Sequence, residues 1–439
     1  MSIAFIVLIL FIILHPVIGW INRRKSEDIR SFVLAGREVS PLSAAASLVA
    51  TIMGASAILG TTGLAQKHGP SAFVWLGAGI LGLTVLIFLI DRVDFRKALS
   101  LPDMLGKHGG AGVRIASALV IIPTWIGIVA AQFAAVGKVA EAVQPGSYLP
   151  VVVVVAICVA AYVALSGQRG VLKTDKFQIV LIFILLLTLV VWMLATGLDV
   201  EKLNYQPLGS LKMVDIAIAV AFPFLIGPDI FSRLLTVKTA SLRKRTLLYT
   251  IVGLLFISAM VIFVGTFAGL FVDFSAKEQL MVKLPEIFWG NIGVTVASVA
   301  LLAAIISSAD TCLFTSATII SVDLLGKSNA KTIAFLSVVM AIISAILALW
   351  LGGVLKALFI SYTIYTSGLA VPAIFALFLK KALPKYTMIV TIVAGSTIGM
   401  IGRFNEQEFT LLFAITVSLL IAVVGNLIEN NKNAFGNNK

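Results

Sequence analysis

Charged residues are scarce in this chain. Only 12% of its 439 residues are Asp, Glu, Lys or Arg, against roughly 25% in a soluble globular protein, and 60% are hydrophobic. A soluble fold is therefore excluded, and the composition is that of an integral membrane protein. Extramembrane domains are lacking too, because the longest loops between apolar runs have about 20 residues and cannot fold alone. The function must lie within the membrane-embedded helices.

The side chains that most enzymes and metal sites use are also few. Two cysteines, Cys158 and Cys312, lie inside apolar runs, so no disulfide framework is expected. The three histidines, His15, His68 and His108, are scattered, and neither a nucleophile elbow nor a cofactor motif is present. An enzyme is therefore disfavoured.

Thirteen apolar runs come close to the roughly 20 residues that cross a bilayer. They lie near residues 3–21, 41–65, 71–91, 112–136, 147–166, 176–196, 213–235, 246–272, 292–322, 332–352, 355–379, 385–402 and 408–429. The first run lacks a basic N-terminal region and a cleavage site, so we expect a retained helix rather than a signal peptide. The sequence predicts an all-α membrane protein with about 13 transmembrane helices.

The positive charges are distributed unevenly between the two sides of this arrangement. Loops on the side of Arg23 hold 25 of the 33 Lys and Arg residues. The positive-inside rule therefore predicts a multi-pass protein of the plasma (inner) membrane, with its N-terminus outside and its C-terminus in the cytoplasm. The net charge of +13 does not indicate nucleic acid as a partner, because the basic residues lie in short loops.

Two predicted spans contain residues that interrupt helices. The 41–65 span carries Gly54 among small residues, and the 213–235 span carries Pro223 and Gly227. Proline removes a backbone donor and glycine weakens a helix, although membrane glycines also serve close packing. The two spans are five apart, as in transporters with inverted repeats and broken helices.

The stretch "AAIISSADTCLFTSATIISVDL", residues 303–324, is unusually polar for a span. Ala304, Ser307, Ser308 and Thr311 are spaced to share one helix face, where oxygen atoms opposite unwound carbonyls suit a small cation. The alternative is that the hydroxyls bond only to carbonyls of their own helix.

Two aspartates in this stretch invite different interpretations. A carboxylate near the bilayer centre costs about 2.5–3.5 kcal/mol, so Asp310 needs a partner, a proton or water. Asp323 lies close to a basic loop, and we expect it to be a solvated residue at the helix end.

Five ordered motifs carry a family resemblance. They are "FVLAGREVSPLSAAASLVATIMGASAILGTTG" at 32–63, "LPDML" at 101–105, "GVLKTDKFQ" at 170–178, "GPDIFSRLLTVKT" at 227–239 and the 303–324 stretch. The chain resembles the sodium:solute symporter family, which implies the leucine-transporter-like fold. The implied organisation is an N-terminal extra helix and loop (1–40), two inverted repeats of five helices (41–210 and 211–380), and C-terminal extra helices and tail (381–439).

The resemblance implies one sodium site and raises a second. The family's shared site aligns with the carbonyls of Ala50, Met53 and Ala304 and the hydroxyls of Ser307 and Ser308. A second site, found in some members, aligns with Asp175, Asp310 and Thr311. Because a carboxylate replaces a hydroxyl at Asp310, this second site is not a plain copy, and Asp310 could instead be protonated or paired with a basic residue.

The solute is less well specified by the sequence. Sugar-binding relatives place polar groups at positions that align with Ile52, Ser56 and Ala57. Because this chain has little there to bond the many hydroxyls of a sugar, a sugar is disfavoured, and a small amino acid or carboxylate fits better. Candidate solute-binding residues are Ile52, Gly54, Ser56, Ala57, Phe73, Trp75, Trp125, Gln132, Phe222, Phe224, Ser361, Tyr362, Tyr365 and Thr366. Aromatic residues in spans are also common as packing or interfacial anchors.

The sequence thus predicts a sodium-coupled symporter of a small organic solute. It would use Na⁺ as its ion, contact the lipid bilayer and function as a monomer. Two alternatives stay open. One is a proton-coupled carrier on the same fold, in which Asp310 or Asp175 titrates. The other is a membrane solute sensor, since some relatives fuse this bundle to a kinase, although no kinase segment is present in this sequence.

Overall fold

The chain folds into a bundle of helices. The computed structural model describes residues 2–21, 29–95, 98–272, 280–350, 353–379, 383–405, 407 and 409–436. Its principal helices are α1 (Ile3–Ile21), α2 (Ile29–Leu34), α3 (Pro41–Ile52), α4 (Thr61–His68), α5 (Phe73–Leu89), α6 (Leu101–Val143), α7 (Tyr148–Thr196), α8 (Ser210–Ile226), α9 (Pro228–Leu235), α10 (Ala240–Ala268), α11 (Leu280–Ile319), α12 (Ala330–Ala348), α13 (Val354–Ala373), α14 (Lys385–Phe404) and α15 (Thr410–Gly436). Within the described ranges there is no strand, so the predicted all-α class is confirmed.

Short helical turns extend or join several of these helices. They are the 3₁₀ turns η1 (Ala35–Arg37), η3 (Gly69–Ala72), η4 (Ile90–Arg92) and η5 (Val200–Lys202), and the π-helical turns η2 (Ser56–Gly60), η7 (Ile320–Leu324) and η8 (Ile374–Phe378). Each π-helical turn lies next to an α-helix, and η2 lies within the interruption between α3 and α4.

Eleven helices of the described chain are long and apolar enough to cross a bilayer. Counting the pair Ile29–Arg37 and Pro41–Ile52, which is bent by 109°, gives twelve. α7 alone has 49 residues and contains two of the predicted spans, on either side of a turn at Gly167. Gly167 has a φ of +55°, and an added Cβ would lie 2.7 Å from the ring of Phe32, so only glycine fits this turn. The total of thirteen stays a prediction.

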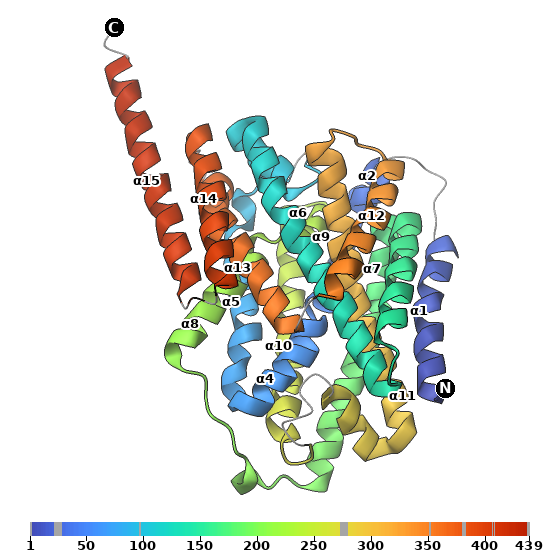
Figure 1. The fold of residues 1–439 in the computed structure, drawn as a ribbon. Coiled ribbons are helices and arrows are strands. Elements are labelled where there is room, and N and C mark those ends of the chain that lie inside the picture. Colours follow the sequence, from blue (N-terminus) through green and yellow to red (C-terminus); the bar gives the residue numbers. More distant parts are fainter. Residues whose placement is uncertain are drawn as a thin grey trace.

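Some helices lie inside the bundle and others at its edges. In α6 and in α11, 78% of the most apolar 18-residue stretch is buried inside the bundle. In α15 the buried share of that stretch is 22%. Figure 1 shows α1 at one edge and α14 with α15 at the other, with the two ends of the chain at opposite ends of the bundle. The extra helices expected at the N- and C-termini therefore flank the remaining helices.

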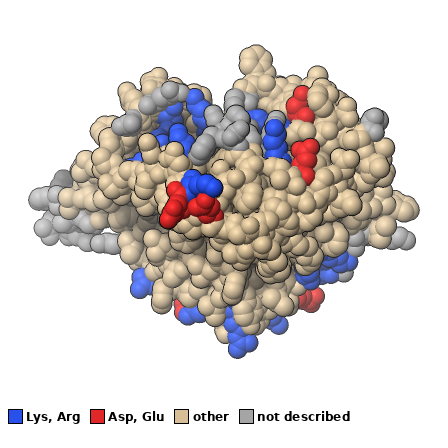
Figure 2. All heavy atoms as spheres, turned by 90° about the horizontal axis from the view of Figure 1, so that it is seen from below, with Lys and Arg blue, Asp and Glu red and all other residues tan. Residues whose placement is uncertain are grey.

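The outer surface is strongly apolar. Large hydrophobic side chains are exposed around the bundle, such as Phe88 at 76% and Phe256 at 66%. Seen from below, at the end where the N-terminus lies, most atoms belong to uncharged residues and the charged side chains form small separate groups (Figure 2). An apolar surface of this extent requires a lipid environment, because water would disfavour its exposure.

Five helices meet in the middle of the bundle. α3 packs against α7, α9 and α11, and α11 also packs against α6, α7 and α9. At each predicted interruption a bordering helix, α3 or α9, therefore contacts α11.

Candidate functional site

The first interruption follows α3. Ile52 is its last helical residue, and Met53 leaves the helix with φ −80° and ψ 42°. Gly54 approaches α11 so closely that an added Cβ would lie 2.1 Å from Ser308 Oγ. The Ser308 hydroxyl donates to the carbonyl of Thr51. The broken end of α3 is thus held directly against the hydroxyl face of α11.

The second interruption lies between α8 and α9. The chain leaves the helix at Gly227, whose φ of −60° and ψ of 132° are extended, and Pro223 lies four residues earlier inside α8. The Tyr365 hydroxyl donates to the carbonyl of Ile226 at 2.6 Å. This bond satisfies a carbonyl that the helix break leaves without an intrahelical partner.

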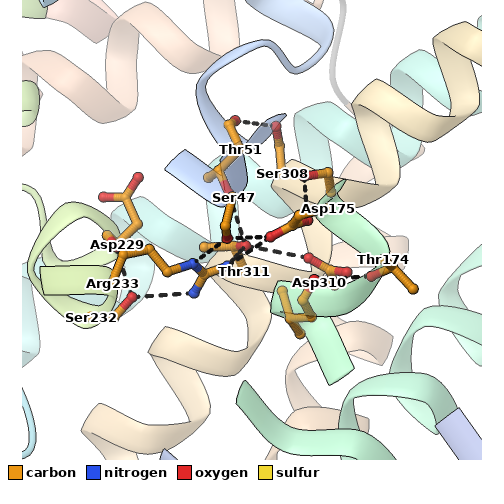
Figure 3. A network of polar contacts seen from close by, with 12 residues as sticks. Ser47, Thr51, Thr174, Asp175, Asp229, Ser232, Arg233, Ser308, Asp310 and Thr311 are labelled. Atoms are coloured by element: carbon orange, nitrogen blue, oxygen red, sulfur yellow. Dashed lines mark hydrogen bonds and ion pairs between the residues drawn. The ribbon is translucent and has the colours of Figure 1, made fainter. Parts of the chain in front are cut away.

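A buried arginine joins the two interruptions (Figure 3). Arg233, on α9, is fully buried, and its Nη2 lies 3.5 Å from Asp175 Oδ2. Its Nε donates to Ser47 Oγ at 2.8 Å, and its Nη2 also donates to the Thr311 hydroxyl. Asp175 accepts hydrogen bonds from Ser47 and, at 2.7 Å, from Ser307. One polar network therefore links α3, α7, α9 and α11.

A second carboxylate adjoins this network. Asp310 is fully buried, and its Oδ1 accepts a 3.3 Å hydrogen bond from the Thr311 hydroxyl. Its Oδ2 accepts no hydrogen bond from the residues that the structure describes. The Thr311 hydroxyl also lies 3.1 Å from that of Thr51, on broken helix α3. Together with Asp175 and Arg233, the buried cluster holds two carboxylates and one guanidinium.

The residues predicted to bind sodium come from the two elements that the structure brings together. They are Ala50, Met53, Ala304, Ser307 and Ser308, and all five are buried. The Ser308 hydroxyl lies 3.5 Å from the Ala304 carbonyl as well as against the end of α3. The Ser307 hydroxyl is directed to Asp175 instead. The sodium-ligand assignment stays a prediction.

A small cavity lies beside the broken helices. Its volume is about 30 Å³, far below the roughly 300–1,000 Å³ of a typical ligand pocket. The lining residues are Thr51, Ile52, Gly54, Ser56, Trp125, Ile128, Gln132, Pro223, Phe224, Asp229, Ile230, Ser308, Cys312, Leu358 and Tyr362. We call this the central cavity. Gln132 is fixed in its wall, because its Oε1 accepts a 2.9 Å hydrogen bond from the Ala55 N–H.

Half of the predicted solute-binding residues line the central cavity. Its wall includes Ile52, Gly54, Ser56, Trp125, Gln132, Phe224 and Tyr362, but not Ala57, Phe73, Trp75, Phe222, Ser361, Tyr365 or Thr366. Phe73 lies at the start of α5 with 38% of its surface exposed. The side chain of Tyr365 supports the α8 break and packs edge-on against Trp125, with ring centroids 4.8 Å apart.

Arg233 and Asp229 were not among the predicted site residues. Both belong to the "GPDIFSRLLTVKT" motif. α9 instead carries Arg233 into the polar network, and Asp229 lines the central cavity. The available signal was that both residues lie inside the predicted 213–235 span, where a charged side chain indicates a functional position.

The expectation for Asp323 was wrong. Its side chain is buried rather than solvated, and its Oδ1 lies 2.6 Å from Arg114 Nε. Arg114 also donates from Nη2 to the carbonyl of Val322 at 2.7 Å. The π-helical turn η7 at the end of α11 brings Asp323 beside α6, where the arginine reaches it.

Comparison with known proteins gives a consistent family match. Residues 32–393 match the sodium:solute symporter family. Sodium/proline symporter 2 of Staphylococcus saprophyticus is 24% identical over 388 residues, which are 79% of this chain and 75% of the relative. Sodium-coupled monocarboxylate transporter 2 of Mus musculus is 24% identical over 265 residues, 56% of this chain and 43% of the relative. A putative sodium-dependent multivitamin transporter of Drosophila melanogaster is 26% identical over 197 residues, 44% of this chain and 33% of the relative.

Solved structures share the fold. A Na⁺-coupled sialic acid symporter in a substrate-bound outward-open state superposes with a TM-score of 0.79 at 17% identity, covering 98% of this chain and 97% of its own. A nucleobase-cation-symport-1 family transporter in a closed conformation superposes with a TM-score of 0.66 at 14% identity. The match covers 90% of this chain and 93% of the transporter. The predicted leucine-transporter-like fold is therefore confirmed.

The buried ion pair gives a stability prediction. Replacing Arg233→Gln leaves Asp175 buried without its cationic partner, and removing one member of a buried pair costs about 3–5 kcal/mol. We expect a clearly lower melting temperature for the purified variant, and partial recovery in Arg233→Gln/Asp175→Asn. Equal melting temperatures for Arg233→Gln and the wild type would show that the pair does not hold the helices together.

Proposed function

The chain belongs to the sodium:solute symporter family, and from this premise we propose that it couples sodium influx to uptake of a small amino acid or carboxylate. Of these two, an amino acid is the better candidate. The observation that carries the proposal is the meeting of broken α3 with the hydroxyl face of α11 at Ser308. Backbone carbonyls and hydroxyls there form a set of hard neutral oxygen ligands, and such ligands suit Na⁺.

The charges of the neighbouring cluster also favour a bound cation. Asp175 and Asp310, when ionised, outweigh Arg233 by one negative charge. An uncompensated charge in a dry site is costly, so one sodium ion nearby would neutralise the cluster. Ion binding would thereby stabilise the packing of α3 against α11, which is how an ion can favour one conformation of a carrier.

The central cavity supports a solute with an amino group. Asp229 supplies a carboxylate to its wall, and Gln132 and Ser56 supply neutral polar groups. Trp125 and Tyr362 provide aromatic surface for a small apolar side chain. A carboxylate without an amino group would meet Asp229 with like charge, which favours an amino acid over a simple monocarboxylate.

Solute binding requires the bundle to open, because the central cavity, at about 30 Å³, is much smaller than a typical ligand pocket. A second cavity of about 730 Å³ lies beyond Trp75 and Phe359, which both line it. The Trp75 ring is 6.0 Å from that of Phe359 and 6.4 Å from that of Tyr362, in the central cavity wall. The guanidinium carbon of Arg403 lies 4.1 Å from the centroid of the Phe359 ring. Its Nη2 lies 2.7 Å from Asp215 Oδ2, an ion pair. Separation of these aromatic rings would join the two cavities.

The remaining expectations fit this mechanism as parts of the proposal. The repeats 41–210 and 211–380 each contain one interruption, so their relative movement would open the central cavity to either side. The N-terminus would lie outside and the C-terminus in the cytoplasm. Function as a monomer is likewise part of the proposal.

Proton coupling is a second candidate, favoured by one observation. Asp310 Oδ2 has no hydrogen-bond donor among the described residues. A proton on Asp310 would remove the extra negative charge of the cluster without a second metal ion. Sodium would then bind only beside Ser308, or not at all.

The sodium site is tested by Ser308→Ala. The variant loses one oxygen ligand and the bond to the end of α3, so the sodium concentration for half-maximal uptake should rise about tenfold or more. Sodium-driven uptake of labelled amino acids into vesicles is the measurement. Ser316→Ala is the matched control, since among the described residues that buried hydroxyl bonds only to the Cys312 carbonyl of its own helix. An unchanged sodium dependence in Ser308→Ala would overturn the assignment.

Asp310→Asn separates sodium from proton coupling. With sodium coupling, removal of one negative charge should weaken sodium binding several-fold and leave the pH profile of uptake similar. With proton coupling, the same variant should lose its pH dependence while the sodium dependence stays unchanged. Uptake measured across sodium concentration and pH distinguishes the two. If the variant shows the wild-type dependence on both sodium and pH, Asp310 takes no part in ion coupling.

Asp229→Asn tests the solute class. We expect at least a tenfold loss in apparent affinity for amino acids, because a charge-assisted hydrogen bond to the ammonium group would be lost. Competition by a panel of amino acids and of the matching deaminated carboxylates is the measurement. The exposed Asp199→Asn serves as the control. If the variant prefers amino acids as strongly as the wild type, the amino group is recognised elsewhere.

A further inference from the structure

A third cavity, of about 530 Å³, lies away from the site described above. Its lining residues are Arg37, Asp91, Arg92, Val93, Asp94, Phe95, Met104, Lys107, His108, Lys238, Arg243 and Leu377. We call it the basic cavity. It lies beside Arg37, which closely follows α2, and Figure 1 shows α2 at the end of the bundle away from the N-terminus.

The lining of the basic cavity has an excess of positive charge. Five Lys or Arg side chains face it with two aspartates, a net charge of +3 with the histidine neutral. Of the two aspartates, Asp91 also forms an ion pair with Lys244, which is outside the lining. Positive charges of this density normally repel one another, so their convergence on one cavity indicates an anionic ligand.

Two of the guanidinium groups are fixed by backbone carbonyls. Arg37 donates from Nη2 to the carbonyls of Phe95 at 3.0 Å and Ala98 at 3.2 Å. Arg243 donates from Nε to the carbonyl of Leu234 at 3.0 Å and lies 4.2 Å over the Phe95 ring. Neutral carbonyls hold these groups in place without cancelling their charge.

Arg92, the third guanidinium group of the lining, is held in the same way. Arg92 donates from Nη1 to the carbonyl of Phe378 at 3.2 Å. Within the described ranges, neither Arg92 nor Lys238 has a carboxylate at ion-pair distance. The three guanidinium groups of the lining are therefore positioned in advance by carbonyls, and none of them has a carboxylate at ion-pair distance among the described residues.

We propose that the basic cavity binds a phosphate-bearing anion. Guanidinium groups match phosphate oxygens with two parallel hydrogen bonds, and lysine adds a mobile positive charge. The ligand could be the headgroup of an anionic phospholipid or a soluble phosphate compound, since both present the same group. Basic pockets at helix ends are suited to lipid headgroups, and the apolar Val93, Met104 and Leu377 at this cavity would contact the first carbons of the acyl chains.

The position of the cavity gives the ligand a role. Arg37 precedes broken α3, Lys238 follows α9, and Arg243 lies in the first turn of α10. Arg92 and Phe95 belong to the connection from α5 to α6. A bound phosphate would bridge segments that lead into both interrupted helices, and so would stabilise the arrangement seen here against opening on this side.

The test uses the full-length protein and charge-removing variants. In neutral detergent at fixed ionic strength, pyrophosphate should raise the melting temperature of the wild type relative to chloride if soluble phosphate is the ligand. In lipid nanodiscs, phosphatidylglycerol should stabilise the protein relative to phosphatidylcholine if a lipid headgroup is the ligand. Either result supports the proposal and identifies the source.

The variants show whether the basic cavity is responsible. Arg92→Gln and Lys238→Gln should each weaken the phosphate effect about tenfold, measured as the concentration or lipid fraction for half-maximal stabilisation, and the double variant should lose it. Arg245→Gln is the matched control, because this exposed arginine adds to the same basic side without lining the cavity. No stabilisation by either phosphate source would overturn the proposal. Equal loss in Arg245→Gln, or full retention in the double variant, would also overturn it.

Discussion

The buried pair of Arg233 and Asp175 is the interaction on which the centre of this structure depends. A guanidinium with no exposed surface must find hydrogen-bond acceptors within the protein, because leaving it unpaired would cost more than the fold can supply. Its acceptors and its ion-pair partner come from α3, α7 and α11, while the arginine itself comes from α9. Packing of these four elements is therefore constrained by one charge. Neither broken helix could shift far without breaking part of that network.

The same network explains why ion binding and conformation can be coupled here. The Ser307 hydroxyl bonds to Asp175, and the next residue, Ser308, bonds to the end of α3. A cation beside Ser308 would thus act on the broken helix and on the buried charges at once. Gly54 makes this possible, since any larger residue would hold α3 away from α11. Short side chains and an excess of one buried negative charge are parts of one arrangement.

Cavities on the two sides of the bundle have different chemistry. The cavity beyond Trp75 is closed from the centre by stacked aromatic rings, and one ion pair, Arg403 with Asp215, supports it. The basic cavity at the other end is lined by arginines held by carbonyls. Aromatic contacts separate at small energetic cost compared with a network of charged hydrogen bonds. The two ends are therefore suited to different means of control.

The sequence by itself determined the membrane class, the helical fold, the family and the polar face of α11. The membrane class, the helical fold and the polar face follow from local features: apolar run length, serine spacing along one helix, and glycine or proline within a run. The family follows from the resemblance of five ordered motifs. The sequence did not determine where Arg233, Asp229 and Asp323 lie. Their positions depend on how α9 and the end of α11 pack against segments more than a hundred residues away, as with Asp323 and Arg114. Only the tertiary structure decided them, because a charge near a helix end can be solvated or buried according to its neighbours.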